Sequence, residues 1–250
     1  MSDALKAAAR LIADARRVVA LTGAGISAES GIPTFREAQT GLWARFSPEA
    51  LATPEAFAAA PERVWAWYRW RRSLIARGGV NAGHRALAEL GTQVPLEVVT
   101  QNVDGLHTAA GSPDVAELHG NIWRERCTAC GHESSTAIID HPGDDLALPS
   151  CAQCNALTRP AVVWFGETLP VDALTTAEAY IREADCVLVI GTSNRVYPAA
   201  ALVEHALRGP ASVIEINIET TPISGSVAVH LAESASHALP QISRRIKARA

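Results

Sequence analysis

The sequence predicts an α/β fold in which helices cover a parallel sheet, together with a second, small zinc-binding domain. Short β-branched apolar runs alternate with helical stretches, which is the pattern of a parallel sheet with helical crossovers. Two segments, 36–80 and 121–160, interrupt this alternation. The second of them contains two close pairs of cysteines, which indicate a metal site rather than disulfides in a cytosolic protein.

The composition excludes several classes of protein. With 250 residues, 48% hydrophobic and 19% charged, the chain is expected to be soluble and globular. A formal net charge of −4 provides no basic surface for nucleic acid, and no apolar run approaches the ~20 residues that span a bilayer. The first 17 residues lack the features of a secretory signal. We therefore expect a cytoplasmic monomer that binds neither nucleic acid nor membrane.

Four apolar runs are the candidate strands, and they lie at 18–21, 96–100, 186–190 and 212–216. The stretches 82–90 and 198–207 fall between them and are expected to be helical, as is the tryptophan-rich segment 36–80. We assign 1–40, 82–120 and 161–250 to the sheet domain. The helical insertion 41–81 and the cysteine module 121–160 are assigned to the small domain. Ligands are expected in the crevice between the two domains.

A glycine-rich turn directly follows the first candidate strand. Gly23 and Gly25 allow a tight turn and a close approach to a pyrophosphate, although such turns also occur without a ligand. Gly31 and Pro33 then exclude the long helix of an ordinary dehydrogenase and predict a loop. Arg36 offers a fixed charge for a phosphate, with a surface arginine as the simpler alternative.

Polar residues follow the other candidate strands. Such residues at the carboxyl ends of parallel strands are suited to hydroxyl, carboxamide and phosphate groups. They are Gln101, Asn102, Asp104, Gly191, Thr192, Ser193, Asn217 and Glu219. Each group alone could be an ordinary loop or an Asx turn. His119, before Gly120, is a candidate general base for a sugar hydroxyl. Alternatively, it could be a structural histidine whose ring nitrogens are hydrogen-bonded within the core.

The cysteine spacing is the most specific local signal. Two C-x-x-C pairs separated by 20 residues predict a four-thiolate zinc site formed by Cys127, Cys130, Cys151 and Cys154. Four protein ligands leave no open position, so the zinc is expected to be structural. The fifth cysteine, Cys186, is expected to be buried in a strand.

These motifs together resemble the sirtuin family, in the same order along the chain, from about residue 10 to about residue 240. The resemblance implies a Rossmann-like NAD-binding domain with a small zinc domain. It also implies an NAD-dependent protein-lysine deacylase that acts on acylated lysine side chains and releases nicotinamide and O-acyl-ADP-ribose. The acyl-lysine oxygen would attack the ribose C1′, and His119 would deprotonate a ribose hydroxyl.

The resemblance also assigns residues to the NAD site. Asp104 and Ile32 would hold the nicotinamide amide, Gln101 and Asn102 would engage the ribose region, and Asn102 would assist His119 in catalysis. The remaining candidates are Gly23, Ala24, Gly25, Ala28, Glu29, Thr34, Phe35, Arg36, Gly191, Thr192, Ser193, Asn217, Glu219 and, as a weaker match, Ala235. The segment Val163, Trp164, Phe165 and Gly166 resembles the strand that pairs with the substrate peptide. Ala161 departs from the histidine that is usual in the family at this position.

A further resemblance concerns the acyl group. Tyr68 and Arg71 lie three residues apart and share a helix face, like the Tyr-x-x-Arg of class III sirtuins, which remove succinyl, malonyl and glutaryl groups. Arg71 would pair with a distal carboxylate while Tyr68 donates a hydrogen bond. Ala52 matches the small residue that widens the acyl pocket. Alternatively, Tyr68 and Arg71 could have no role in acyl binding, because Arg69 and Arg72 show that arginine is common in this helix.

Three other functions share parts of this pattern. Mono-ADP-ribosyl transfer uses the same first step. An NAD-linked oxidoreductase shares the glycine turn but needs no four-thiolate site. A zinc-ribbon binding module shares the cysteines but leaves most of the chain unexplained.

Overall fold

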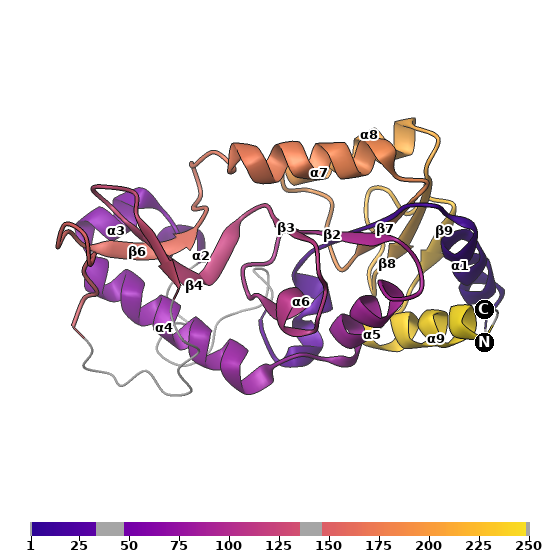
Figure 1. Ribbon diagram of the computed structural model, residues 1–250, viewed down its shortest axis with the longest axis horizontal. Coiled ribbons are helices and arrows are strands. Elements are labelled where there is room, and N and C mark those ends of the chain that lie inside the picture. Colours follow the sequence, from indigo (N-terminus) through magenta and orange to yellow (C-terminus); the bar gives the residue numbers. More distant parts are fainter. Residues whose placement is uncertain (1, 34–47, 136–146, 249–250) are drawn as a thin grey trace.

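A six-stranded, entirely parallel sheet forms the centre of the computed structural model, which describes residues 2–33, 48–135 and 147–248 (Figure 1). In spatial order its strands are β3 (Val115–Glu117), β2 (Leu96–Thr100), β1 (Val18–Thr22), β7 (Cys186–Ile190), β8 (Ser212–Ile216) and β9 (Val229–Leu231). This is the order of a Rossmann sheet, with the topological switch point between β1 and β7. The predicted fold class is confirmed, and β3 and β9 are additional strands.

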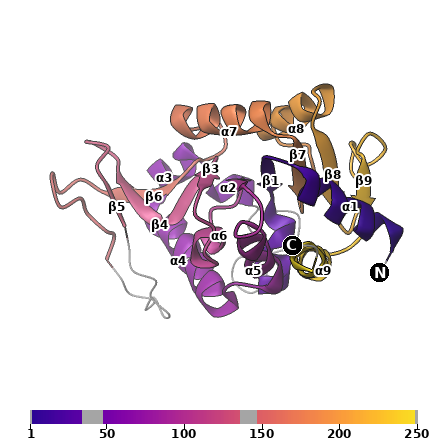
Figure 2. The same cartoon turned by 45° about the vertical axis from the view of Figure 1, so that its right-hand side comes forward.

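Helices cover both faces of this sheet (Figures 1 and 2). Alternate residues of β1 point to opposite faces, so Val18 and Ala20 pack on one side and Val19 and Leu21 on the other. The first face is covered by α1 (Asp3–Asp14), α5 (Ala82–Leu90) and α9 (Ala235–Lys247). The second face is covered by α7 (Val171–Glu183) and α8 (Ala199–Arg208). Burial on both faces explains why the strands are continuous apolar runs.

A smaller unit lies beyond the β3 edge of the sheet (Figure 1). It contains α2 (Pro48–Leu51), α3 (Pro54–Ala59), α4 (Pro61–Gly78) and an antiparallel sheet of β5 (Glu133–Ser135), β4 (Gly120–Cys127) and β6 (Thr158–Val162). Helix α4 begins with a proline in its first turn and ends at Gly79, whose φ is +61°. The Trp65 indole donates to the Thr158 carbonyl at 2.9 Å and so joins α4 to β6.

The described part of the tryptophan-rich segment, 48–80, is helical as expected and is divided into α2, α3 and α4. Thr53 caps α3 by accepting from the Ala56 amide at 3.1 Å, and this cap starts a new helix after α2. A short helix, α6 (Leu106–Ala109), follows β2. Within the described parts of the chain, no helix combines the length and apolar character needed to cross a membrane.

Candidate active site

Two glycine turns meet at the switch point of the sheet. The Gly25 amide donates to the Gly191 carbonyl at 2.8 Å, and the Gly23 amide donates to the Ile190 carbonyl at 2.9 Å. A Cβ on Gly25 would lie 2.6 Å from the Gly191 Cα, and one on Gly191 would lie 2.5 Å from the Ile26 nitrogen. Gly191 also has a φ of +58°. Only glycine fits both positions, so the two turns pack directly against each other.

Two 3₁₀ turns, η1 (Ala24–Ile26) and η2 (Ala28–Ser30), follow the first glycine turn in place of a long helix. They end at Gly31 with a φ of +72°, as the sequence predicts. The Asn81 side chain holds them by donating to the Ile26 carbonyl at 2.7 Å. The Ser234 hydroxyl donates to Glu29 at 3.1 Å, just before Ala235 begins α9. The predicted NAD contacts Thr34, Phe35 and Arg36 lie outside the described residues.

A buried polar cluster of Ser27, Asn102 and Asp104 lies beneath the glycine turn. The Ser27 hydroxyl donates to the Asp104 carboxylate at 2.7 Å, and the Asn102 amide donates to Ser27 and to the Gly23 carbonyl, both at 3.1 Å. All three side chains are at most 9% exposed. Ser27 was not among the predicted site residues, and its place inside the glycine-rich motif was the available signal.

Two buried histidines support this cluster. His84 Nε2 lies 3.3 Å from the Ser27 hydroxyl, and His107 Nε2 lies 2.8 Å from the Thr22 hydroxyl. Because Thr22 gives its own proton to Thr100, His107 must donate from Nε2. Burial lowers the pKa of His84, and it lowers the pKa of His107 to about 3, so both rings are neutral at pH 7. Sequence reasoning left both histidines without a role.

His119 lies between β3 and β4, with its ring partly exposed. Its Nδ1 lies 2.8 Å from the Gln101 carbonyl, which can only accept, so the proton is on Nδ1 and the lone pair is on Nε2. Burial lowers the pKa of His119, although the bond to Gln101 opposes this. The ring is therefore a neutral imidazole of fixed orientation at pH 7, with a lone pair on Nε2 that can accept a proton.

The loops after β2, β7 and β8 are joined by hydrogen bonds. The side-chain amide of Gln101 donates to the Thr192 hydroxyl at 3.0 Å, and the side-chain amide of Asn217 donates to the Thr192 carbonyl at 2.9 Å. The backbone amide of Glu219 donates to the side-chain oxygen of Asn217 at 3.3 Å. Ser193 lies in the same connection after β7. The structure thus brings the polar residues at four strand ends to one edge of the sheet.

The candidate acyl pocket lies where α4 meets the end of β6. The Trp164 indole nitrogen donates to the Tyr68 hydroxyl oxygen at 2.8 Å, and both side chains are buried. The Arg71 guanidinium lies over the Trp67 ring, 5.1 Å from its centroid. Ala52 is also buried, and its carbonyl accepts from the Phe165 amide at 2.9 Å. Burial raises the pKa of Tyr68 to about 12, so its hydroxyl remains a donor.

The neighbouring arginines point elsewhere. Arg72 donates from Nε to the Ile122 carbonyl at 2.7 Å and pairs with Glu125 at 3.4 Å. Arg69 donates to the Ala147 carbonyl at 2.8 Å. Both contacts lead into the small unit. Burial lowers the pKa of Arg71, and the nearby Tyr68 and Asp104 oppose this shift.

The segment after β6 runs between His119 and the acyl pocket. The Val163 amide donates to the His119 carbonyl at 2.8 Å, and Phe165 is 47% exposed. Gly166 turns the chain with a φ of +86°. A cavity of about 1070 Å³ borders this segment and is lined by Val163 and Gly166 together with residues of β3, β4 and α7. It lies beside the predicted NAD residues rather than among them.

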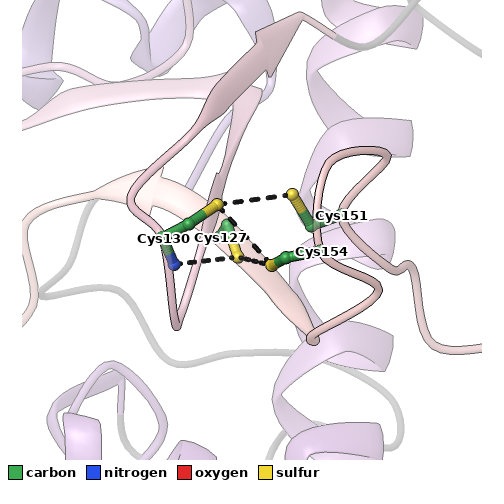
Figure 3. Close-up of side chains that lie close together, drawn as sticks. All are labelled: Cys127, Cys130, Cys151 and Cys154. Atoms are coloured by element: carbon green, nitrogen blue, oxygen red, sulfur yellow. Dashed lines mark hydrogen bonds between the residues drawn. The ribbon is translucent and has the colours of Figure 1, made fainter.

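The four paired cysteines converge on one point (Figure 3). Their sulfur atoms all lie within 4.8 Å of one another, with separations of 3.4 Å for Cys127–Cys154 and 3.7 Å for Cys130–Cys151. A disulfide requires about 2.05 Å. Thiolates at about 2.3 Å around a tetrahedral zinc lie roughly 3.8 Å apart, which fits the observed set. These residues form a site for a structural zinc ion, and Cys186 is buried in β7 as expected.

Known proteins share both the sequence and the fold. The Sir2 family model matches residues 23–198. An NAD-dependent protein deacylase of Aquifex aeolicus is 52% identical over 90% of this chain and 93% of its own. NAD-dependent protein deacylase 2 of Pyrobaculum aerophilum is 48% identical over 96% and 95%. A solved Sir2 homolog–NAD complex superposes with a TM-score of 0.91 at 42% identity, over 98% and 94% of the two chains. The chain therefore belongs to the Sir2, or sirtuin, family.

Proposed function

We propose that this protein is an NAD-dependent protein-lysine deacylase with a preference for acidic acyl groups such as succinyl and malonyl. The observation that carries the deacylase assignment is His119, a neutral base oriented by Gln101 at the edge where the polar strand ends meet. The similar proteins of Aquifex and Pyrobaculum bear the name NAD-dependent protein deacylase. A similar Sir2 structure, with a TM-score of 0.83, is a complex with a p53 peptide and NAD⁺.

The strand ends at the switch point fit NAD. A Cβ at Gly23 or Gly25 would strike the β7 turn, so glycine is needed for the two turns to meet at the switch point. A glycine turn after the first strand at a switch point is where Rossmann folds bind a pyrophosphate. The buried Ser27, Asn102 and Asp104 provide amide and carboxylate groups for a nicotinamide carboxamide and a ribose. When bound, NAD would supply an electrophilic ribose carbon and a leaving group.

The protein would contribute orientation and one proton acceptor. His119 Nε2 would take the proton of a ribose hydroxyl, because the other ring nitrogen is already engaged by Gln101. Asn102 is held by Ser27 and Gly23 and would position the ribose. The segment Val163–Gly166 would pair with the peptide backbone and hold the acyl amide near its reaction partner.

The acyl preference rests on the pocket of Tyr68 and Arg71. Arg71 offers a fixed positive charge and Tyr68 a neutral hydroxyl donor on one face of α4, beside the Trp67 and Trp164 rings. This combination suits a carboxylate at the far end of the acyl chain. The small side chain of the buried Ala52 would favour a longer acyl chain over a bulkier residue at this position. An acetyl group would reach neither polar residue and would gain nothing from them.

Mass spectrometry of matched succinylated and acetylated peptides, with and without NAD, tests both parts of the proposal. We expect NAD-dependent loss of the acyl group from both peptides, faster from the succinylated one, with equimolar nicotinamide. Intact peptides without nicotinamide release would refute the deacylase assignment. Peptides that gain ADP-ribose would show mono-ADP-ribosyl transfer instead. A preference for the acetylated peptide would refute only the acidic-acyl assignment.

A further inference from the structure

We infer that Trp164 is a specificity-determining residue, whose indole N–H fixes the Tyr68 hydroxyl as a donor to the distal carboxylate of the acyl group. This inference rests on the proposed preference for acidic acyl groups. Trp164 would thus have a second function, separate from any contact that its backbone makes with the substrate peptide.

The first step of the argument is the direction of the hydrogen bond. The indole nitrogen can only donate, so at 2.8 Å the Tyr68 oxygen is the acceptor. A phenol has one proton, and the indole occupies an acceptor position of its oxygen. Within residues 2–33, 48–135 and 147–248, no group accepts a hydrogen bond from the Tyr68 hydroxyl. The hydroxyl is therefore free to donate to a ligand, and it is biased against accepting from one.

The second step is that this geometry is rigid. The backbone amide of Trp164 donates to the Glu167 carboxylate at 2.8 Å. The Arg159 guanidinium donates to both oxygens of the same carboxylate, at 2.5 and 2.9 Å. The guanidinium carbon of Arg159 lies 3.3 Å from the centroid of the Trp164 ring. Phe57 contacts the same ring, with a centroid separation of 5.4 Å. The indole cannot turn without disrupting its contacts with a partly buried ion pair and with an aromatic ring.

The third step is the balance of charge. Arg159 is 8% exposed, and Glu167 neutralises it, so its charge is already compensated within the protein. Arg71 lies three residues after Tyr68 on the same face of α4, with its guanidinium over the Trp67 ring, and so offers a positive charge close to the Tyr68 hydroxyl. A carboxylate between the Tyr68 hydroxyl and Arg71 would complete a chain of hydrogen bonds that begins at Trp164. A neutral acetyl group would leave the Tyr68 proton without this acceptor.

The variant Trp164→Phe tests the inference, because phenylalanine keeps an aromatic face for Arg159 and Phe57 but lacks the N–H. The ratio of kcat/KM for a succinylated peptide to that for the matching acetylated peptide should fall about five- to tenfold, the factor expected for one hydrogen bond. Backbone contacts common to both peptides cancel in this ratio. Trp65→Phe removes another buried indole bond, the one to Thr158, and should leave the ratio unchanged. An unchanged ratio in Trp164→Phe would overturn the inference.

A double-mutant cycle shows whether Trp164 acts through Tyr68. The variant Tyr68→Phe should lower the ratio, and adding Trp164→Phe to it should lower the ratio no further. Independent, multiplicative effects would contradict the inference while leaving the acidic-acyl assignment intact. If the wild-type enzyme showed no preference for the succinylated peptide, the proposed function itself would fail.

A measurement on the wild-type protein avoids the risk that Trp164→Phe does not fold. Hydrogen bonds in a chain strengthen one another, so a carboxylate that accepts from Tyr68 strengthens the bond from Trp164. The indole proton resonance of Trp164, identified by its response to Tyr68→Phe, should move downfield with a bound succinylated peptide and not with the acetylated one. Equal responses to the two peptides would overturn the inference.

Discussion

His119 and Gln101 are joined by a hydrogen bond of 2.8 Å between the imidazole Nδ1 and the backbone carbonyl. A backbone carbonyl cannot rotate away, so the orientation of the ring is built into the connection after β2. The same bond determines which nitrogen is the base. It therefore leads to predictions about turnover and about its dependence on pH.

Replacing His119 with alanine should lower kcat on an acylated peptide by roughly 10²–10⁴ without unfolding the protein. Among the described residues, the His119 side chain hydrogen-bonds only to the backbone carbonyl of Gln101, just after β2, so its loss leaves the strands paired. Steady-state kinetics, with thermal unfolding as the control for folding, gives the answer. Near-normal turnover in a folded variant would remove His119 from the role of base.

The activity should decline on the acid side at a pH below 6.5. The base must be neutral, and burial lowers the pKa of His119 below its usual 6.5, so activity persists as the pH falls to that value and is lost beneath it. The pH profile of kcat/KM for the acetylated peptide reports this ionisation in the free enzyme. An acid limb centred above pH 7 would be inconsistent with the proposed base.

Arg71→Met should reduce desuccinylation far more than deacetylation, by about 2–5 kcal/mol in transition-state stabilisation, the cost of removing one partner of a buried charge pair. Arg69→Met is the matched control, because Arg69 lies on the same helix but binds the Ala147 carbonyl. The two peptides should be compared by kcat/KM. Equal losses on both peptides would show that Arg71 supports the fold rather than the acyl group.

The free energy of unfolding should fall as the pH drops below 6.5, and His107 should contribute. Its pKa in the folded protein is about 3, against 6.5 when unfolded, so the unfolded state binds the extra proton first. Between pH 6.5 and 4.5 this amounts to about 2 kcal/mol. Urea unfolding of His107→Gln should show a correspondingly shallower dependence on pH. An identical dependence in both proteins would place the titration elsewhere.

The purified protein should contain one zinc ion per chain, and Cys151→Ser should lose it. Structural zinc sites contribute directly to folding, so the variant should unfold at a lower temperature. Cys186→Ala is the control, because Cys186 lies in β7 of the other sheet and should leave the metal content unchanged. Full zinc content in Cys151→Ser would contradict the four-thiolate site.

Much of the fold could be predicted because burial on both faces leaves a continuous apolar run in each central strand. The runs at 18–21, 96–100, 186–190 and 212–216 all lie in strands of the parallel sheet. Strands β3 and β9 have three residues each, too few for a recognisable pattern. The spatial order of the strands depends on packing between distant segments, which local periodicity does not contain.

The candidate site divides in the same way. The cysteine pairs and the glycine turn could be predicted, because a metal and a tight turn each require particular residue types at fixed spacing. The hydrogen bonds by which His84 and His107 support the polar cluster could not be predicted, because the neutral state of both rings results from burial in the folded protein. The bond between Tyr68 and Trp164 joins residues 96 positions apart, and no motif records such a pairing.

The contact between the turns at Gly25 and Gly191 has a consequence for engineering. The two turns pack against each other with no room for a side chain between them, so the length and path of one turn constrain the other. An insertion in either would separate the two halves of the sheet at the cofactor edge. Redesign of this enzyme for other dinucleotides should therefore keep both turns unchanged and vary the side chains around them.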